Sequence, residues 1–342
     1  MKKNALGIIY FFIHLIMEIT SFYILTTYTN SNLIWLIALF YDFFAFVPQG
    51  LFGYIKDIGI KINFTILGLV LSTIALILLY LKLDPIIVVL VIAIGNALIH
   101  VEGAEETLKS SAGKMTPSAL YVSGGSFGLI TGKLLSIYKV PIIYIILINL
   151  LMIIPILISR KYKDMINEKN IEKYNFANKN MNKKIIILLA VIVVIVRAFM
   201  GYGIPISWNK TVFQTILLFT FMGIGKAMGG ILIDKIGIRK TSFISTLGAL
   251  PLLIFGNNLM IVSLFGIMMF SMTMAITLGL IVSVIKKYPT VGFGFTTIGL
   301  FLGTLPIFFF RINSTIVNMI IVIALTLPCV IILSRICRKE TL

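Results

Sequence analysis

Apolar stretches of about 20 residues recur along this sequence from one end to the other. A helix of that length rises about 30 Å, which is the thickness of the hydrocarbon core of a bilayer. Charged residues make up 12% of the 342 residues, whereas soluble domains contain about 25%, and the mean hydropathy is +1.07. The chain is therefore expected to span a membrane many times, and no polar region is long enough for a soluble domain.

The apolar stretches fall into two groups of six, separated by one polar stretch. We therefore expect an all-α polytopic membrane protein with about twelve transmembrane helices in two pseudo-symmetric six-helix bundles. The expected spans are residues 5–28, 32–55, 62–82, 85–107, 117–137, 140–159, 185–205, 210–233, 241–258, 260–285, 291–311 and 314–335. The bundles comprise residues 1–159 and 185–342, and the polar stretch, residues 160–184, is expected to be an amphipathic or disordered cytoplasmic tether.

The distribution of Lys and Arg predicts the orientation of the spans. Cytoplasmic loops of membrane proteins retain positive charge, and a cytoplasmic N-terminus places most basic residues of this chain inside. The exceptions are Lys82, Lys139, Lys210 and Arg311. Both termini are then cytoplasmic, and the net charge of +17 reflects membrane topology, so we expect no nucleic-acid partner. The expected location is the cytoplasmic membrane, with the lipid bilayer as the main neighbour.

One short motif occurs twice, after the second and the eighth expected spans. Its members in the two halves are, in chain order, Gly53, Asp57, Gly59 and Lys61, and then Gly230, Asp234, Gly237, Arg239 and Lys240. Glycine allows two helices to approach closely, and aspartate can cap a helix end and pair with neighbouring bases. We expect these residues to form a latch that keeps one conformational state closed.

The duplicated motif, in register with six spans, a linker and six spans, resembles the signature of the major facilitator superfamily of secondary transporters. The resemblance implies that two bundles rock about a central site and expose it to each side of the membrane in turn. It also implies a monomer that moves a small-molecule substrate together with protons. No enzymatic activity, no cofactor and no bound metal are expected.

Shorter patches resemble the fosmidomycin-resistance branch of that superfamily, which exports small compounds. They are His14-Leu15-Ile16-Met17-Glu18, the stretch from Gly95 to Ala104 with His100 and Glu102, and Val196-Arg197. Glu18 stands where the branch has Asp, and Ile99 and Val101 stand where it has Phe and Pro. In the fifth span, Lys133 follows a glycine where many exporters have Pro. The resemblance implies proton-driven export of a small, anionic or drug-like solute.

Acidic residues and histidines inside the spans are candidates for proton coupling, because ionisable groups are costly in a membrane and face cavities or partners. Glu18 is the first candidate and Asp42 the second. His14 lies one helical turn from Glu18, and His14 and His100 could relay its proton. A change of exposure between conformations would load and release the proton.

Basic residues inside the spans are candidates for binding substrate. Arg197 falls at about the same depth as the two acids, and its guanidinium could clamp an anionic group bidentately. Lys133 would add a second positive charge, and Glu102 is a further candidate substrate contact. Lys226 is expected only to snorkel or to contribute to a latch.

The same residues leave other functions open. Glu18 or Asp42 could pair permanently with Arg197 in a purely structural role. The ionisable set also fits an uptake symporter or a divalent-metal carrier. A membrane-embedded enzyme could use the His and Glu cluster as a catalytic or metal-binding centre, because imidazole and carboxylate suit divalent ions.

Overall fold

The computed structural model describes residues 4–203, 207–310 and 314–338, and within these ranges the chain forms helices and loops without any β-strand. Within these described ranges, ten segments are long and apolar enough to cross a membrane. The shorter apolar helix α4 (Phe64–Tyr80) and the 22-residue helix α6 (Thr116–Ile137) complete the roughly twelve expected crossings.

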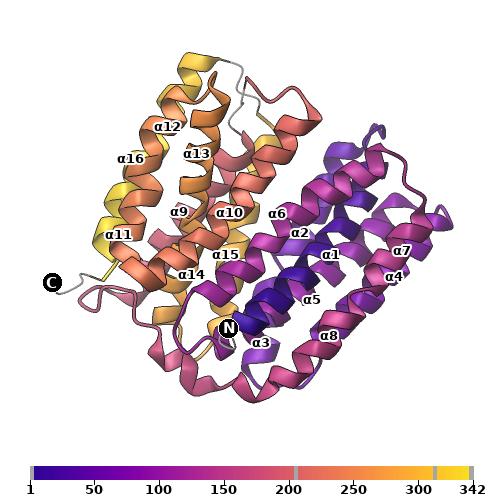
Figure 1. The fold of residues 1–342 in the computed structure, drawn as a ribbon, viewed down its shortest axis with the longest axis horizontal. Helices are drawn as coiled ribbons and strands as arrows, with labels where there is room; N and C mark the ends of the chain where they lie inside the picture. Colours follow the sequence, from indigo (N-terminus) through magenta and orange to yellow (C-terminus); the bar gives the residue numbers. More distant parts are fainter. Residues whose placement is uncertain (1–3, 204–206, 311–313, 339–342) are drawn as a thin grey trace.

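The helices form two halves that lie side by side (Figure 1). The first half contains α1 (Ala5–Thr27), α2 (Ile34–Phe46), α3 (Gln49–Asp57), α4, α5 (Pro85–Ser110), α6, α7 (Ile142–Leu150) and α8 (Ile153–Ser159). The second contains α9 (Lys183–Gly203), α10 (Val212–Ile236), α11 (Ile238–Phe243), α12 (Ala249–Phe255), α13 (Met260–Ser271), α14 (Thr273–Val284), α15 (Pro289–Thr304), the 3₁₀ helix η5 (Leu305–Phe308) and α16 (Thr315–Ile336). Contacts of α6 with α10 and of α3 with α15 join the halves.

Several expected spans are two helices in series. Span 32–55 is divided between α2 and α3 at Pro48, whose ring removes a backbone hydrogen-bond donor. A π-turn, η4 (Ile244–Gly248), separates α11 from α12, and Met272 separates α13 from α14. Such breaks let a segment change direction while still crossing the membrane.

A row of glycines on α6 brings this helix against α1. A Cβ atom added to Gly124, Gly128 or Gly132 would collide with the α1 backbone. Small residues at every fourth position allow this kind of close helix packing inside membranes. The α1–α6 contact places the side chains of His14 and Glu18 beside α6 and next to the second half.

The polar stretch between the halves was expected to be amphipathic or disordered, and it forms short helices that dock on both halves. It contains two 3₁₀ helices, η2 (Arg160–Met165) and η3 (Glu168–Lys173). The buried Tyr174 hydroxyl bonds to Ser111 and to the Lys114 carbonyl in the first half, and Phe176 N–H donates to Ser283 Oγ in the second. The segment is polar overall, but a few of its residues, such as Tyr174 and Phe176, point inward and hold it against both halves.

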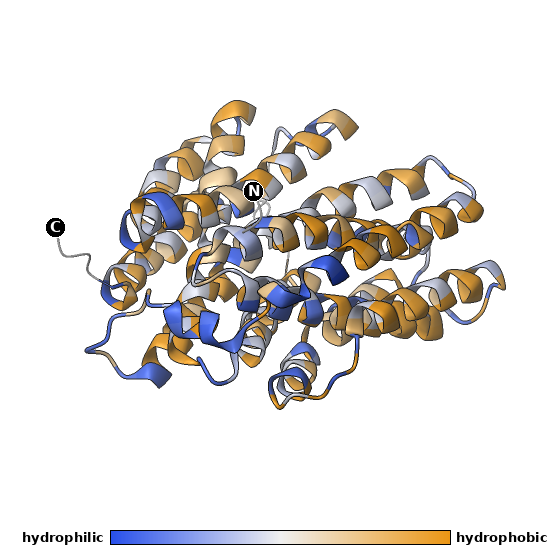
Figure 2. Cartoon of the chain, turned by 60° about the horizontal axis from the view of Figure 1, so that its bottom comes forward, coloured by the Kyte–Doolittle hydropathy of each residue, from blue (hydrophilic) through white to orange (hydrophobic). Residues whose placement is uncertain are grey.

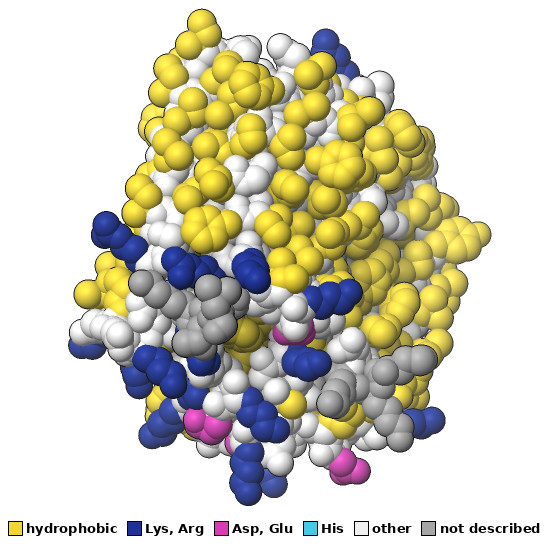
Figure 3. All heavy atoms as spheres, turned by 60° about the vertical axis from the view of Figure 1, so that its left-hand side comes forward, with side chains coloured by type: hydrophobic (Ala, Val, Ile, Leu, Met, Phe, Trp, Pro, Cys, Tyr) yellow, Lys and Arg dark blue, Asp and Glu magenta, His cyan; other side chains and the backbone are white. Residues whose placement is uncertain are grey.

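Charge is concentrated at the end of the molecule that carries this linker and α3, which we call the linker face. Figure 2 shows hydrophilic residues gathered there, and Figure 3 shows Lys and Arg side chains around one end of an otherwise largely apolar surface. The last described residues of the chain also lie at this face, because Arg338 N–H donates to the Phe176 carbonyl in the linker. By the positive-inside rule, the linker face is the predicted cytoplasmic side.

Candidate functional site

A cavity of about 340 Å³ lies between the two halves. Its walls come from helices of both halves, among them α1, α2, α5, α9 and α10. Its lining includes the acids, bases and histidines His14, Glu18, Asp42, His100, Arg197 and Lys226, together with Tyr41. The tertiary structure thus brings together the four predicted proton-coupling residues and Arg197.

Glu18 lies at the centre of a buried polar cluster. Its Oε1 atom is 3.5 Å from His14 Nε2 and 3.7 Å from His100 Nε2. Asn96 Nδ2 donates a hydrogen bond of 2.9 Å to the same oxygen. Only 7% of the Glu18 surface is exposed, so the cluster meets the cavity through a small opening.

The hydrogen bonds of the two histidines determine which ring nitrogen carries hydrogen. His14 Nδ1 is 3.1 Å from the Tyr121 carbonyl, and His100 Nδ1 is 3.0 Å from the Asn96 carbonyl. A carbonyl only accepts, so each Nδ1 must donate, and each neutral ring then directs a lone pair from Nε2 toward Glu18. The lone pairs of Glu18 Oε1 and of the two histidine Nε2 atoms repel one another unless a cation lies between these three atoms. This geometry therefore holds a proton, or an equivalent positive charge, next to Glu18.

A metal ion would satisfy the same requirement. The candidate ligand atoms of His14, Glu18 and His100 all lie within 4.8 Å of one another. Imidazole and carboxylate suit several divalent ions. The metal-carrier and metal-enzyme alternatives therefore stay open, and a binding measurement can test them.

The sequence analysis assigned no role to Asn96, which orders this cluster. Besides Glu18, the Asn96 amide contacts Tyr41 Oη at 2.6 Å and Ser21 Oγ at 3.2 Å. A buried amide inside a transmembrane helix is costly unless it is hydrogen-bonded. This cost is the one sequence signal that could have identified it.

Asp42 connects the cavity to the other half. Its side chain on α2 accepts a hydrogen bond of 3.4 Å from Thr304 Oγ1 on α15. Because the partners belong to different halves, this contact has to change when the halves move.

Lys226 occupies a different environment from the one predicted. It lies ten residues before the end of α10, lines the cavity, and donates a 2.8 Å hydrogen bond to Ser126 Oγ on α6. Its ammonium group interacts electrostatically with Arg197 and with Glu18. The expectation of a snorkelling residue is wrong, because the helix extends well beyond Lys226 on the linker side.

Two predicted substrate contacts lie elsewhere. Glu102 accepts hydrogen bonds from Lys56 Nζ and Phe64 N–H, both at 2.9 Å, near the linker face. Lys133 is exposed on α6 and is absent from the described lining of the cavity. The structure therefore supports neither residue as a substrate ligand in this conformation.

Each aspartate of the duplicated motif binds the first turn of a helix in the opposite half. Asp57 Oδ2 accepts the backbone N–H groups of Thr290 and Val291 at the start of α15, both at 2.9 Å. Asp234 accepts the N–H groups of Met115 and Thr116 at 2.9 Å and the Thr116 hydroxyl at 2.6 Å, at the start of α6. A carboxylate is stabilising there, because the first N–H groups of a helix have no partner within the helix.

Glycines of the motif permit these contacts. A Cβ atom on Gly53 would lie 2.7 Å from the Thr290 carbonyl oxygen, and one on Gly230 would lie 2.7 Å from that of Met115. Gly59 and Gly237 adopt φ values of +87° and +85°, which favour glycine.

The basic members of the motif play a different part from the one expected. Among the residues that the structure describes, Lys61, Arg239 and Lys240 form no ion pair with Asp57 or Asp234. The halves are instead latched at the linker face through helix capping, and their helices diverge toward the opposite face (Figure 1).

Comparison with known proteins identifies the fold. No family model and no curated protein matches this sequence. Among solved structures, a variant of the E. coli fucose:proton symporter FucP has a TM-score of 0.66 and 14% identity, over 97% of each chain. FucP in the outward conformation has a TM-score of 0.63 and 16% identity, over 96% of this chain and 97% of that one.

A third solved structure, the proton:xylose symporter XylE bound to 6-bromo-6-deoxy-D-glucose, has a TM-score of 0.64 and 14% identity, over 95% of this chain and 94% of that one. The comparisons do not single out the fosmidomycin-resistance branch, and export also stays a prediction. The chain has the fold of the major facilitator superfamily of transporters.

Proposed function

We propose that this protein is a proton-coupled secondary transporter of a small organic anion, that it works by alternating access, and that Glu18 is its proton site. One observation carries the proposal: two histidine Nε2 atoms and a carboxylate oxygen converge in a geometry that requires a positive charge. This cluster lines a cavity between two halves with the fold of proton symporters.

Charge balance in the cavity favours a proton and an anion bound together. With Glu18 and Asp42 ionised, their charges cancel those of Arg197 and Lys226. A proton on the Glu18 cluster makes the site positive, and an anion then restores neutrality. A neutral loaded site is the one that can most readily close and cross a medium of low dielectric constant.

Alternating access then requires the latch to open. Release of Asp57 and Asp234 from the two helix starts would let the halves separate at the linker face. The same movement would bring them together at the opposite face. Substrate and proton would leave on the linker side.

The test uses purified protein in liposomes that enclose a pH-sensitive dye, with no imposed pH gradient. Small sulfonates are suitable anions, because they stay ionised and do not carry protons across lipid. An inward anion gradient should acidify the lumen in the wild type. Alkalinisation would instead indicate antiport, the direction that the predicted export function requires.

Glu18→Gln separates coupling from binding. The glutamine amide can donate to a histidine Nε2 as a protonated carboxyl would, so the anion should still bind while proton movement is lost. Glu172→Gln is the matched control, because Glu172 is exposed in the linker. Normal proton movement in Glu18→Gln would refute the assignment, and stoichiometric binding of Zn²⁺ that depends on both histidines would favour the metal alternatives.

A further inference from the structure

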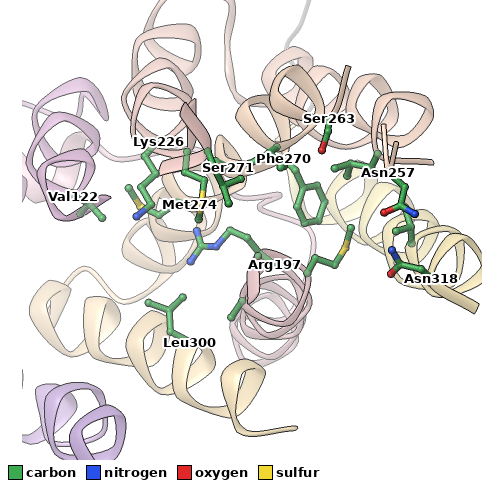
Figure 4. Close-up of a pocket in the computed structure, with 18 residues that line it drawn as sticks. Val122, Arg197, Lys226, Asn257, Ser263, Phe270, Ser271, Met274, Leu300 and Asn318 are labelled. Carbon is green, nitrogen blue, oxygen red and sulfur yellow. The ribbon is translucent and has the colours of Figure 1, made fainter. Parts of the chain in front are cut away.

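A second cavity of about 130 Å³ lies inside the second half and adjoins the central one. The two cavities share the lining residues Val122, Arg197, Lys226, Met274 and Leu300. We call the second cavity the side chamber, and Figure 4 shows its lining.

The side chamber is polar at its two ends and apolar between them. Arg197 and Lys226 extend toward each other at the end next to the central cavity (Figure 4). Phe270 lies in the middle, with other apolar side chains along the walls, whereas Asn257 and Ser263 lie at the far end. A ligand that fits here has an apolar body and a charged group at the mouth.

The second half supplies almost no acid to balance its two cations at the mouth. Between Lys183 and Arg338 the sequence contains one acidic residue, Asp234, whose carboxylate binds the start of α6. The acids that share the central cavity with Arg197 and Lys226, Glu18 and Asp42, belong to the first half. An anion is therefore attracted to the two cations once a proton neutralises the Glu18 cluster, and the attraction is strong in a region of low dielectric constant. The planar guanidinium suits a carboxylate, sulfonate or phosphonate in particular.

The volume of the side chamber limits the apolar body. An apolar cavity of about 150 Å³ in a protein core is large enough to bind benzene. The side chamber, at about 130 Å³, has room for one ring of that size or a branched aliphatic group. Asn257, Ser263, Ser271 and Asn318 also line the chamber, but methionine, leucine and phenylalanine side chains line its middle. A sugar placed there would leave hydroxyl groups without partners, which is unfavourable.

We propose that the transported anion carries a single apolar ring, with its acid group between Arg197 and Lys226 and its ring in the side chamber. The inference rests on the proposed function, because it takes the central cavity as the transport site. It adds the substrate class: small aromatic carboxylates, sulfonates or phosphonates, as opposed to sugars and inorganic anions.

Equilibrium binding to the purified full-length protein tests the inference without any transport. Benzenesulfonate is the probe, methanesulfonate has the charge without the ring, and benzyl alcohol has the ring without the charge. We expect benzenesulfonate to bind at least tenfold more tightly than either of the others. Arg197→Gln should reduce its affinity by at least tenfold.

Two variants address the chamber itself. Leu218→Phe fills it and should reduce benzenesulfonate affinity at least tenfold while methanesulfonate binding, which also reports correct folding, is unchanged. Phe270→Ala enlarges it and should favour naphthalenesulfonate over benzenesulfonate. Leu188→Phe is the matched control on the exposed face of α9.

The outcomes separate the two proposals. Equal affinity for benzenesulfonate and methanesulfonate, or no effect of Leu218→Phe, would overturn the substrate class. Proton movement driven by methanesulfonate as strongly as by benzenesulfonate would also overturn it, while leaving the proposed function in place. Ring-dependent binding without any proton movement would support the substrate class and refute the coupling.

Discussion

The two aspartate contacts of the latch differ in a way that predicts unequal effects of the same substitution. Asp57 uses one oxygen atom for both of its backbone hydrogen bonds. Asp234 uses both oxygens, one for Met115 N–H and the other for the Thr116 N–H and hydroxyl. Asparagine has only one acceptor oxygen, and its NH₂ group cannot accept a hydrogen bond.

The magnitudes follow from this difference. In Asp57→Asn the amide oxygen can keep both hydrogen bonds and loses only their charge assistance, which costs about 1 kcal/mol. In Asp234→Asn at least one buried donor loses its acceptor and faces an NH₂ group, which costs about 3 kcal/mol. Since 1.4 kcal/mol is tenfold in an equilibrium constant, the ratio of latched to open molecules should fall roughly tenfold or less in Asp57→Asn and roughly hundredfold in Asp234→Asn.

A distance between spin labels at the opposite face can measure this shift. Tyr138, just after α6, and Phe213, at the start of α10, are 67% and 65% exposed and can be replaced by labelled cysteines. The native cysteines, Cys329 and Cys337, are both buried and would first be changed to alanine. When the latch opens, the halves approach at the opposite face, so a population with a shorter distance should appear.

A substitution at a helix N-cap within one half is the control for this distance measurement. Asp84→Asn makes the same chemical change at a helix N-cap that lies within one half, at the start of α5, and should leave the distance unchanged. If Asp57→Asn shifts the population as much as Asp234→Asn, or more, the count of acceptor oxygens does not determine the strength of the latch.

Three further predictions concern stability. Lys56→Met should destabilise the fold by about 3 kcal/mol, because Glu102 loses its ion pair with Lys56 and Glu105 keeps only its ion pair with Lys109. A thermal melt that matches wild type would contradict this. Gly128→Ala should lower the apparent Tm by several degrees through collision with α1, whereas Gly50→Ala, whose Cβ would lie at an ordinary contact distance of 3.8 Å from Ile298, should not. Burial raises the pKa of Tyr174 above its ordinary value of 10.0. The contribution of the neutral Tyr174 hydroxyl to folding stability is therefore complete below pH 10.0, and it is lost as the pH rises toward the pKa of Tyr174 in the folded protein. Proteolysis of the linker should therefore increase above pH 10.0 in the wild type, and Tyr174→Phe should show no such step; a step of equal size in the variant would exclude Tyr174 as its source.

The fold could be predicted from the sequence, because it depends on local composition, and a repeat in the sequence marked where the two halves meet at the linker face. The length and hydropathy of each stretch determine which segments cross the membrane, as α1, α5 and α16 illustrate. The duplicated glycines and aspartates mark equivalent positions in the two halves. Depth along a helix follows from residue number at 1.5 Å per residue, and the three residues that it groups, Glu18, Asp42 and Arg197, line one cavity.

Rotation about each helix axis, and the contacts between the halves, were decided only by the tertiary structure. Lys226 faces the cavity, whereas Lys133, also inside a span, faces away from it. Asn96 and Glu102 lie six residues apart on α5, yet one orders the Glu18 cluster and the other pairs with Lys56 near the linker face. The physical reason is that almost every face of a transmembrane helix is apolar, so the sequence contains little amphipathic pattern to show which face meets protein and which meets lipid.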